Sequence, residues 1–254
     1  MKFKDIKNLV LFYLSVPKCV GCKARLSKTD FALCPECMRE YLEIKSRNCS
    51  ICSNTLDKCS CSTKYLDSHY IHKLIKVFRY VQKENLPSNN LIYSLKRDNR
   101  KDVLDFLTDE LETSLSNSVD NVNECVFINV PRRRSAKLKY GLDHAEKLAK
   151  NLAKRFSAEY YQPIISKSIL PQKKTIGKER IKNAKFYLKK KARELNSRTV
   201  IIVDDIVTTG ASLGSCAMLV HALGAKKIIG AVVSVAYKDS YTPFNMDDRF
   251  YNMK

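Results

Sequence analysis

The sequence lacks an apolar stretch long enough to cross a membrane. Its only early apolar run, residues 9–14, is far shorter than the roughly 20 residues that a transmembrane helix needs. No small-residue cleavage site follows this run, so a secretory signal peptide is not indicated. The sequence also has no G-x-x-x-x-G-K-S/T motif, which excludes a P-loop. We therefore expect a cytoplasmic protein without membrane insertion.

Acidic side chains are scarce as well. The chain has 26 Asp and Glu residues against 46 Lys and Arg residues, a formal net charge of +20. The excess is concentrated between Arg132 and Glu194, where 20 basic residues face 5 acidic ones. Such a segment attracts polyanions, among them nucleic acid, ligands that bear pyrophosphate and anionic lipid. A solvated basic face is the alternative interpretation.

Cysteine is abundant, and its spacing is regular. Eight of the ten cysteines form four close pairs, at Cys19, Cys22, Cys34, Cys37, Cys49, Cys52, Cys59 and Cys61. Disulfides are not expected in the cytoplasm, and the C-x2-C-x2-C spacing of an iron–sulfur cluster is absent. Two close pairs supply the four thiolates of a tetrahedral zinc site, so the sequence predicts two structural zinc ions. Sequential and cross-braced pairing are both compatible with the spacing.

The gaps between the first three close pairs are each eleven residues long, which indicates a doubled zinc ribbon. A short segment with few large apolar side chains depends on its metal ions to fold. The remaining cysteines, Cys125 and Cys216, are interpreted as core residues.

Residues 200–212 read VIIVDDIVTTGAS. The apolar residues 200–203 predict a strand that is buried on both faces, as in a parallel sheet. Asp204 and Asp205 follow, then a turn of small residues, and then a helical pattern from Leu213 that stops at Gly224. This arrangement presents backbone N–H groups to a phosphate. Because carboxylates repel a bare phosphate, the ligand should also bring hydroxyls or a metal, as a sugar phosphate bound with Mg²⁺ does.

Arginines follow another predicted strand, Cys125–Val130. The carboxyl ends of parallel strands are where α/β proteins bind ligands. Guanidinium groups match phosphate oxygens in bidentate geometry. Arg132 and Arg133 are therefore candidate phosphate ligands, and a solvated basic loop is the alternative.

The VIIVDDIVTTGAS motif resembles that of the type I phosphoribosyltransferases, in which two hydrophobic residues, two acids and a hydrophobic residue precede a T-T/S-G-x-S/T loop. The resemblance implies that the motif binds the ribose and 5′-phosphate of phosphoribosyl pyrophosphate (PRPP), with Mg²⁺, and that the two acids act in catalysis. The implied PRPP-binding residues are Asp204, Asp205, Thr208, Thr209, Gly210, Ala211 and Ser212, with Arg132 and Arg133 on the pyrophosphate side.

The remaining segments have the periodicity of strands or helices. Strands are predicted at residues 65–83 (strand or hairpin), 164–165 and 227–236. Helices are predicted at residues 91–95, 103–115 and 143–156. Asp143 and Glu146 are typical of a capping box at the start of the last helix, where His144 is expected to be exposed. The basic stretch 166–186 is expected to be a loop over the ligand, with Lys173, Lys174 and Arg180 near the pyrophosphate.

We therefore expect an α/β protein with a type I phosphoribosyltransferase-like parallel sheet and flanking helices, preceded by a small cysteine-rich module. The predicted parts are a double zinc-ribbon module (1–64), a connector and hood-like segment (65–124), the phosphoribosyltransferase-like domain (125–238) and a polar tail (239–254).

This order resembles the ComF family of competence proteins, in which a double zinc ribbon precedes a phosphoribosyltransferase domain. The matching residues are Arg132, Arg133, Arg134, Gly141, Ala145, Glu146, Gln172, Glu179, Arg180, Asn183 and Phe186. Leu142, Asp143 and His144 stand where the family usually has Phe, Asn and Gln. The resemblance implies a role in natural transformation, in which internalised single-stranded DNA is handled in the cytosol alongside a helicase-like partner.

Two other functions stay open at this point. One is a metabolic phosphoribosyltransferase of the nucleotide-salvage type, acting on an unidentified base or amine. The other is a non-catalytic adapter that holds a partner through its zinc module. The sequence does not decide whether PRPP is turned over, and it fixes neither the acceptor nor the oligomeric state.

Overall fold

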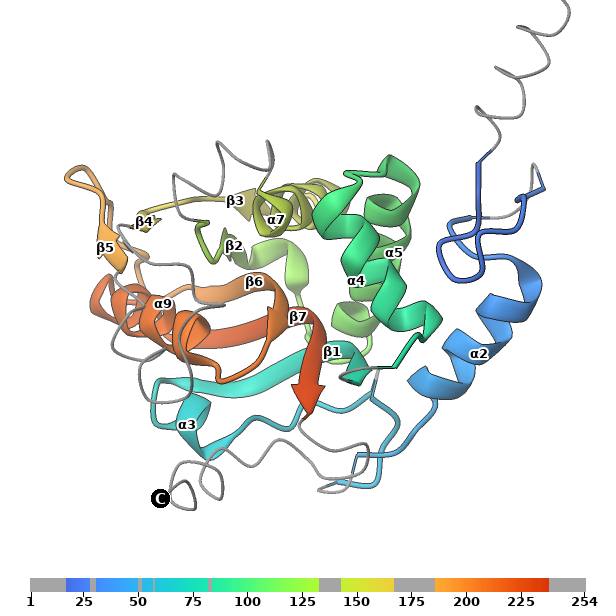
Figure 1. The fold of residues 1–254 in the computed structure, drawn as a ribbon. Coiled ribbons are helices and arrows are strands. Elements are labelled where there is room, and N and C mark those ends of the chain that lie inside the picture. The colour runs from blue at the N-terminus through green and yellow to red at the C-terminus, as the bar shows by residue number, and fades with distance from the viewer. Residues whose placement is uncertain are drawn as a thin grey trace, which may run out of the picture.

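A five-stranded parallel sheet lies at the centre of the computed structural model (Figure 1), which describes residues 17–27, 31–49, 52–56, 58–81, 84–132, 143–166 and 186–237. The strand order is β1-β7-β6-β2-β3, and every neighbouring pair is parallel. The strands are β1 (Ile71–Val81), β2 (Val126–Asn129), β3 (Glu159–Tyr160), β6 (Thr199–Val207) and β7 (Lys227–Tyr237). The predicted parallel sheet is confirmed.

The helices cover both faces of this sheet. They are α2 (Pro35–Lys45), α3 (Lys64–Asp67), α4 (Pro87–Arg97), α5 (Lys101–Ser116), the 3₁₀ turn η1 (Val122–Glu124), α7 (His144–Arg155) and α9 (Ala211–Ala222). A separate antiparallel pair joins β4 (Ile164–Ser166) to β5 (Phe186–Leu188). Within the described ranges, no helix combines the length and the apolar character that spanning a membrane would require.

Strand β6 is buried on both faces, as its unbroken apolar run predicted. Side chains alternate along a strand, so Ile201 and Val203 join the cluster beneath α4, α5 and α7. Val200 and Ile202 point the other way and join the cluster beneath α3 and α9. The sheet is therefore the middle layer of three, with α4, α5 and α7 on one side and α3 and α9 on the other (Figure 1).

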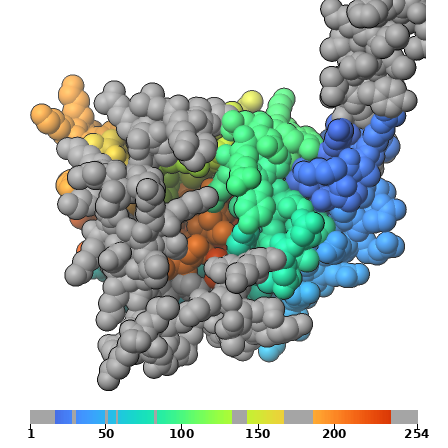
Figure 2. Space-filling model, viewed as in Figure 1, coloured from blue at the N-terminus to red at the C-terminus, as the bar shows by residue number. Residues whose placement is uncertain are grey.

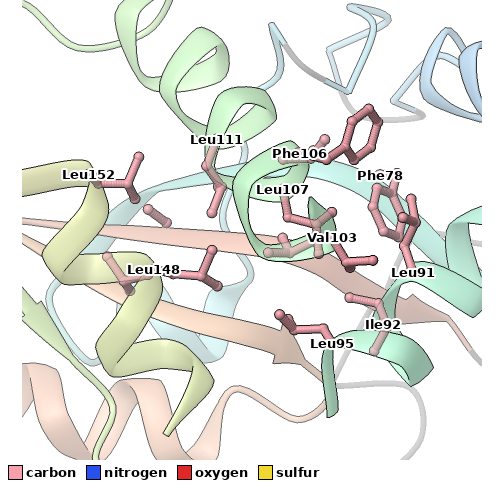
Figure 3. Close-up of a cluster of buried hydrophobic side chains, with 14 of the residues drawn as sticks. Phe78, Leu91, Ile92, Leu95, Val103, Phe106, Leu107, Leu111, Leu148 and Leu152 are labelled. Atoms are coloured by element: carbon pink, nitrogen blue, oxygen red, sulfur yellow. The ribbon is translucent and has the colours of Figure 1, made fainter. Parts of the chain in front are cut away.

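The first strand of the sheet comes from the segment predicted as a connector. β1 runs as one strand from Ile71 to Val81 and pairs in parallel with β7, with one irregularity between Ile71 and Lys73, so the alternative of a hairpin is excluded. The prediction of strand from residue 65 is wrong at its start, because α3 covers residues 64–67. Residues 65–124 thus supply an edge strand together with α4 and α5. Figure 3 shows side chains from these helices, among them Leu91, Leu107 and Leu111, gathered with Leu148 and Leu152 of α7.

The cysteine-rich module shares this core. Tyr41 of α2 is fully buried and meets Phe78 of β1 and Phe106 of α5 edge to face, with ring centroids 5.7 and 5.4 Å away. Its hydroxyl donates to Glu110 at 2.6 Å, and Lys45 pairs with the same carboxylate at 2.7 Å. Figure 2 shows the N-terminal residues (blue) against the surface of α4 and α5 (green). The module is therefore packed onto the α/β body.

Candidate functional site

The acid pair lies near the carboxyl end of β6. The strand was predicted to stop at Val203, but it continues to Val207 because Asp204, Ile206 and Val207 keep their pairing with β7. By strand alternation, Asp205 continues the face that looks toward α4 and α7, and Asp204 continues the face that looks toward α9. The two carboxylates therefore meet different surroundings.

The turn after β6 leads directly into α9. The helix begins at Ala211, two residues earlier than predicted, with Gly210 as its N-cap at φ 75°. This left-handed conformation favours glycine, and a Cβ here would also lie 2.9 Å from Cδ2 of Leu66 in α3. The first N–H groups of an α-helix lack intrahelical acceptors and attract anions. The predicted phosphate-binding residues 208–212 thus form this turn and the start of α9, beside the acid pair.

A lysine from α4 reaches the acid pair. Nζ of Lys96 lies 3.1 Å from Oδ2 of Asp205, and the two side chains are only 28% and 16% exposed. Residue 96 stands more than 100 positions before Asp205 in the chain, in a segment that we interpreted as a connector. The predicted helix 91–95 stops one residue before Lys96, and no motif marks this lysine as a site residue.

The surroundings of Asp204 disfavour ionisation of its carboxyl group beside the charged Asp205. Burial, and then the charge of Asp205, raise the pKa of Asp204 well above its usual range, whereas the Asp205 backbone N–H and Lys96 oppose this shift. That N–H donates to Oδ1 of Asp204 at 2.9 Å. Two adjacent carboxylates of this kind favour ligands that bring positive charge or donor groups, such as Mg²⁺ and sugar hydroxyls.

His144 is buried beside this pair, so the prediction of an exposed histidine is wrong. Its exposure is 3%, because the α4–α5 junction covers it and Asn99 Oδ1 lies 2.9 Å from its Nε2. Its Nδ1 lies 3.3 Å from Nη1 of Arg132. Because a guanidinium only donates, Nδ1 must accept and Nε2–H must donate to Asn99. Burial, and then the charge of Arg132, lower the pKa of His144 to about 4, so the ring is neutral at pH 7.

Arg132 is held at the start of α7. Its backbone N–H donates to Oδ2 of Asp143 at 3.0 Å, while Oδ1 of Asp143 accepts from the Glu146 N–H at 3.3 Å. The predicted N-cap of the helix is confirmed, and the same carboxylate fixes the backbone that follows β2. Asn129 of β2 is in register with Val203 of β6, so Arg132 follows its strand at the same edge of the sheet where the acid pair follows Val203.

Several predicted site residues lie outside the described residues. They are Arg133 and Arg134 after β2, and Lys173, Lys174 and Arg180 in the predicted basic loop 166–186, of which residues 167–185 are outside the description. The predicted polar tail 239–254 is outside it as well. Strands β4 and β5 stand immediately before and after residues 167–185. The roles predicted for these residues stay predictions.

The structure brings the eight paired cysteines into two groups of four. Cys19, Cys22, Cys34 and Cys37 form the first group, and Cys49, Cys52, Cys59 and Cys61 form the second. Within each group the sulfur atoms lie within 4.8 Å of one another, and none of the ten cysteines, all of which the structure describes, forms a disulfide. The pairing is therefore sequential, which the spacing alone left open.

The first turn of each group has the same backbone geometry. The N–H of Cys19 donates to Ala24 O at 2.7 Å, and the N–H of Cys49 donates to Asn54 O at 2.8 Å. The residue after the second cysteine is left-handed in both turns, with φ 67° at Lys23 and φ 58° at Ser53. The bridges Lys18–Arg25 and Asn48–Thr55 close the two turns alike. This repetition supports the doubled arrangement predicted from the equal gaps.

The first group has the donor chemistry of a metal site. Burial opposes ionisation of Cys19, but backbone N–H groups of Cys22, Cys34 and Gly21 outweigh it and lower its pKa to about 7. A Cβ at Gly21 would lie 2.5 Å from Cys37 Sγ, so only glycine leaves room for that sulfur. Four thiolates fit Zn²⁺ with every coordination position filled, which is typical of a structural site.

The second group packs against the sheet. Lys76 of β1 is 4% exposed, and its Nζ donates to Cys61 O at 2.8 Å. Burial raises the pKa of the Cys59 thiol, and the charge of Lys76 opposes this shift. Burial, and then the Cys52 side chain, raise the pKa of Cys61 to about 12. A divalent cation would reverse these shifts by stabilising the thiolates, so this group also suits zinc.

Comparison with known proteins identifies the domain type. Residues 141–252 match the family model of the phosphoribosyl transferase domain. No curated protein matches the chain significantly. Similar solved structures include a purine phosphoribosyltransferase from Pyrococcus horikoshii Ot3, with 20% identity, a TM-score of 0.35 and coverage of 56% of this chain and 78% of that chain. An adenine phosphoribosyltransferase from Thermoanaerobacter pseudethanolicus ATCC 33223 has 15% identity, a TM-score of 0.36 and coverage of 59% and 86%.

Because these TM-scores are below 0.5, the assignment rests on the family match and on the parallel sheet. The chain has a type I phosphoribosyltransferase-like α/β fold preceded by cysteine groups. Strands β1 and β2 precede the matched segment, so part of the central sheet comes from outside it.

The two cysteine groups predict a metal content of about two zinc ions per chain, because each ion takes four thiolates. Cys19→Ser and Cys49→Ser should each reduce the content by about one ion, measured by elemental analysis of protein purified without chelator. Cys125→Ser is the control, since it removes a buried cysteine outside both groups. Metal-free wild-type protein would contradict the prediction.

The buried His144 predicts a pH-dependent stability. Between pH 6.5 and about 4 the unfolded chain binds a proton on this residue that the folded chain does not, so stability should fall as pH falls through this window. The loss should be about 2 kcal/mol after solvent screening. Urea unfolding at several pH values measures it. His144→Gln should remove this part of the slope, whereas His72→Gln, at a side chain that is 76% exposed, should leave it intact.

Proposed function

We propose that the protein is a ComF-type competence protein that handles internalised single-stranded DNA in the cytosol and binds PRPP with Mg²⁺ at the acid pair. The observation that carries the proposal is the placement of Asp204 and Asp205 beside the Gly210 turn, in a chain whose two four-cysteine groups pack on the same body. The phosphoribosyl transferase domain match supports the ligand, and the order of the parts supports the family.

Each part of PRPP has a partner of suitable chemistry in this proposal. The ribose hydroxyls donate to the carboxylates of Asp204 and Asp205. The 5′-phosphate accepts from N–H groups of residues 208–212 at the start of α9. Arg132, held by its contacts to Asp143 and His144, attracts the pyrophosphate. When bound, Mg²⁺ neutralises pyrophosphate charge, and carboxylate oxygens are the ligands it prefers.

The same arrangement suits transfer of the ribosyl group. When the bond from ribose C1 to pyrophosphate breaks, positive charge develops on the sugar and negative charge on the leaving group. The carboxylates of Asp204 and Asp205 stabilise the positive charge on the sugar, and Arg132 stabilises the negative charge on the leaving pyrophosphate. A metabolic phosphoribosyltransferase is therefore the second candidate, favoured by the family match. Release of pyrophosphate in the presence of a base or amine would distinguish it.

The acid pair predicts the outcome of a binding experiment. Asp204→Asn combined with Asp205→Asn should abolish binding of Mg²⁺–PRPP in calorimetry, because the amides neither hold the metal ion nor attract developing positive charge. The same variant should fail to restore transformation in a strain that lacks the protein.

The matched control for this experiment is Asp109→Asn with Glu112→Gln. These two acids on α5 pair with Arg155, and their replacement also removes two negative charges, but away from the acid pair. Unchanged affinity in the Asp204/Asp205 variant would refute the assignment of the site. If a variant that no longer binds PRPP still supported normal transformation, PRPP binding would not be needed for the role in competence.

The basic segment after β2 predicts salt-sensitive binding of single-stranded DNA. Replacing Arg132, Arg133 and Arg134 by Ala should weaken binding and reduce the slope of log K against log salt by about 2, at roughly 0.7 for each lost phosphate contact. Fluorescence anisotropy with a labelled oligonucleotide across a salt series measures both. Replacing Arg39, Arg47 and Lys58 on the cysteine module is the charge-matched control. Salt-independent binding, or none, would favour the metabolic or adapter function.

A further inference from the structure

Lys96 contacts the acid pair but lies outside the segment that matches the phosphoribosyl transferase domain. It belongs to the last turn of α4, whereas the family match begins at residue 141. Its ammonium bonds Asp205 at 3.1 Å, with both side chains mostly buried. An ion pair in such a place is a stronger interaction than an exposed one, because fewer water molecules screen it. The lysine is therefore a fixed part of the surroundings of the acid pair.

Lys96 and Arg132 are linked through His144. The ring contacts Arg132 through Nδ1 at 3.3 Å and, through Nε2 at 2.9 Å, Asn99, which follows Lys96 by three residues. Arg132 follows β2, whose Asn129 is in register with Val203 of β6, so it lies near the edge of the sheet where Asp204 and Asp205 stand. These contacts bring Lys96 and Arg132 to the same end of the sheet as the acid pair.

The helix that carries Lys96 is anchored along its length. At its start, Asn89 donates to Val81 O at 2.6 Å, and Asn90 donates to Gly21 O at 3.3 Å. Just after its end, Arg100 donates to Lys18 O at 2.6 Å. The helix is thus held between β1 and the first cysteine group, which fixes where its last turn lies. A charged group positioned in advance loses little conformational entropy when a ligand arrives.

We propose that Lys96 is a ligand-binding residue whose ammonium donates to the pyrophosphate group of PRPP while it stays paired with Asp205. An ammonium has three donors, and the bond to Asp205 uses one of them. Pyrophosphate carries several negative charges, and the adjacent acid pair would repel it unless a cation stood between them. The inference rests on the proposed binding of PRPP and names a residue that the family match does not contain.

Calorimetry with two ligands tests this role. Mg²⁺–PRPP carries the pyrophosphate group, whereas ribose 5-phosphate has the same sugar and 5′-phosphate without it. Lys96→Met should weaken binding of PRPP by about tenfold to a hundredfold, the value expected for a lost charge-assisted hydrogen bond. It should change binding of ribose 5-phosphate by less than about threefold, and Lys96→Arg should recover most of the PRPP affinity.

Lys150→Met is the matched control, because Lys150 of α7 also pairs with a carboxylate, Glu146 at 2.7 Å, but its ammonium lies over the ring of Tyr160 in β3. It should bind both ligands like the wild type. Unchanged PRPP affinity in Lys96→Met would overturn the inference, and so would an equal loss for both ligands, which would mean that Lys96 acts only through Asp205. Wild-type protein that binds no PRPP would instead overturn the proposed function itself.

Discussion

The parallel pairing of β1 with β7 is the contact on which the rest of the structure depends. It joins the N-terminal half of the chain to the phosphoribosyltransferase-type domain from Ile71 to Val81, with one irregularity between Ile71 and Lys73. Through β1 the second cysteine group is fixed as well, because Leu74 donates to Ser60 O and Lys76 donates to Cys61 O. Tyr41 of the module packs on Phe78 of the same strand. The cysteine-rich part and the α/β body therefore share one core.

This pairing also decides what surrounds the acid pair. The chain leaves β1 at Val81 and enters α4 at Pro87, so the helix crosses the same face of the sheet toward which Asp205 points. Two neighbouring carboxylates would repel each other in this half-buried position. The backbone N–H of Asp205 and the charge of Lys96 oppose that repulsion, but burial and Asp205 still hold the pKa of Asp204 well above its usual range. The pair of acids is therefore suited to a ligand that brings positive charge or hydroxyl donors.

Much of the fold could be predicted because its signals are local. The apolar run before Asp204, the capping residue Asp143 and the regular cysteine spacing each depend on a few consecutive side chains. The burial of His144 could not be predicted in this way. A single polar residue near a helix start has no pattern, and its partners Asn99 and Arg132 come from other elements. The same holds for Lys96, whose partner lies more than 100 positions away.

Local sequence alone specifies three features of this protein: the buried strand that carries two acids, the turn of small residues after it, and the four close pairs of thiols. Periodicity and spacing depend on residues that are close together in the chain, so they do not depend on how distant segments pack. Contacts between distant segments fix the sequential grouping of the cysteines, the place of β1 in the main sheet and the ion pair of Lys96 with Asp205. These outcomes depend on which distant surfaces bury one another, and that choice is made by packing of the whole core.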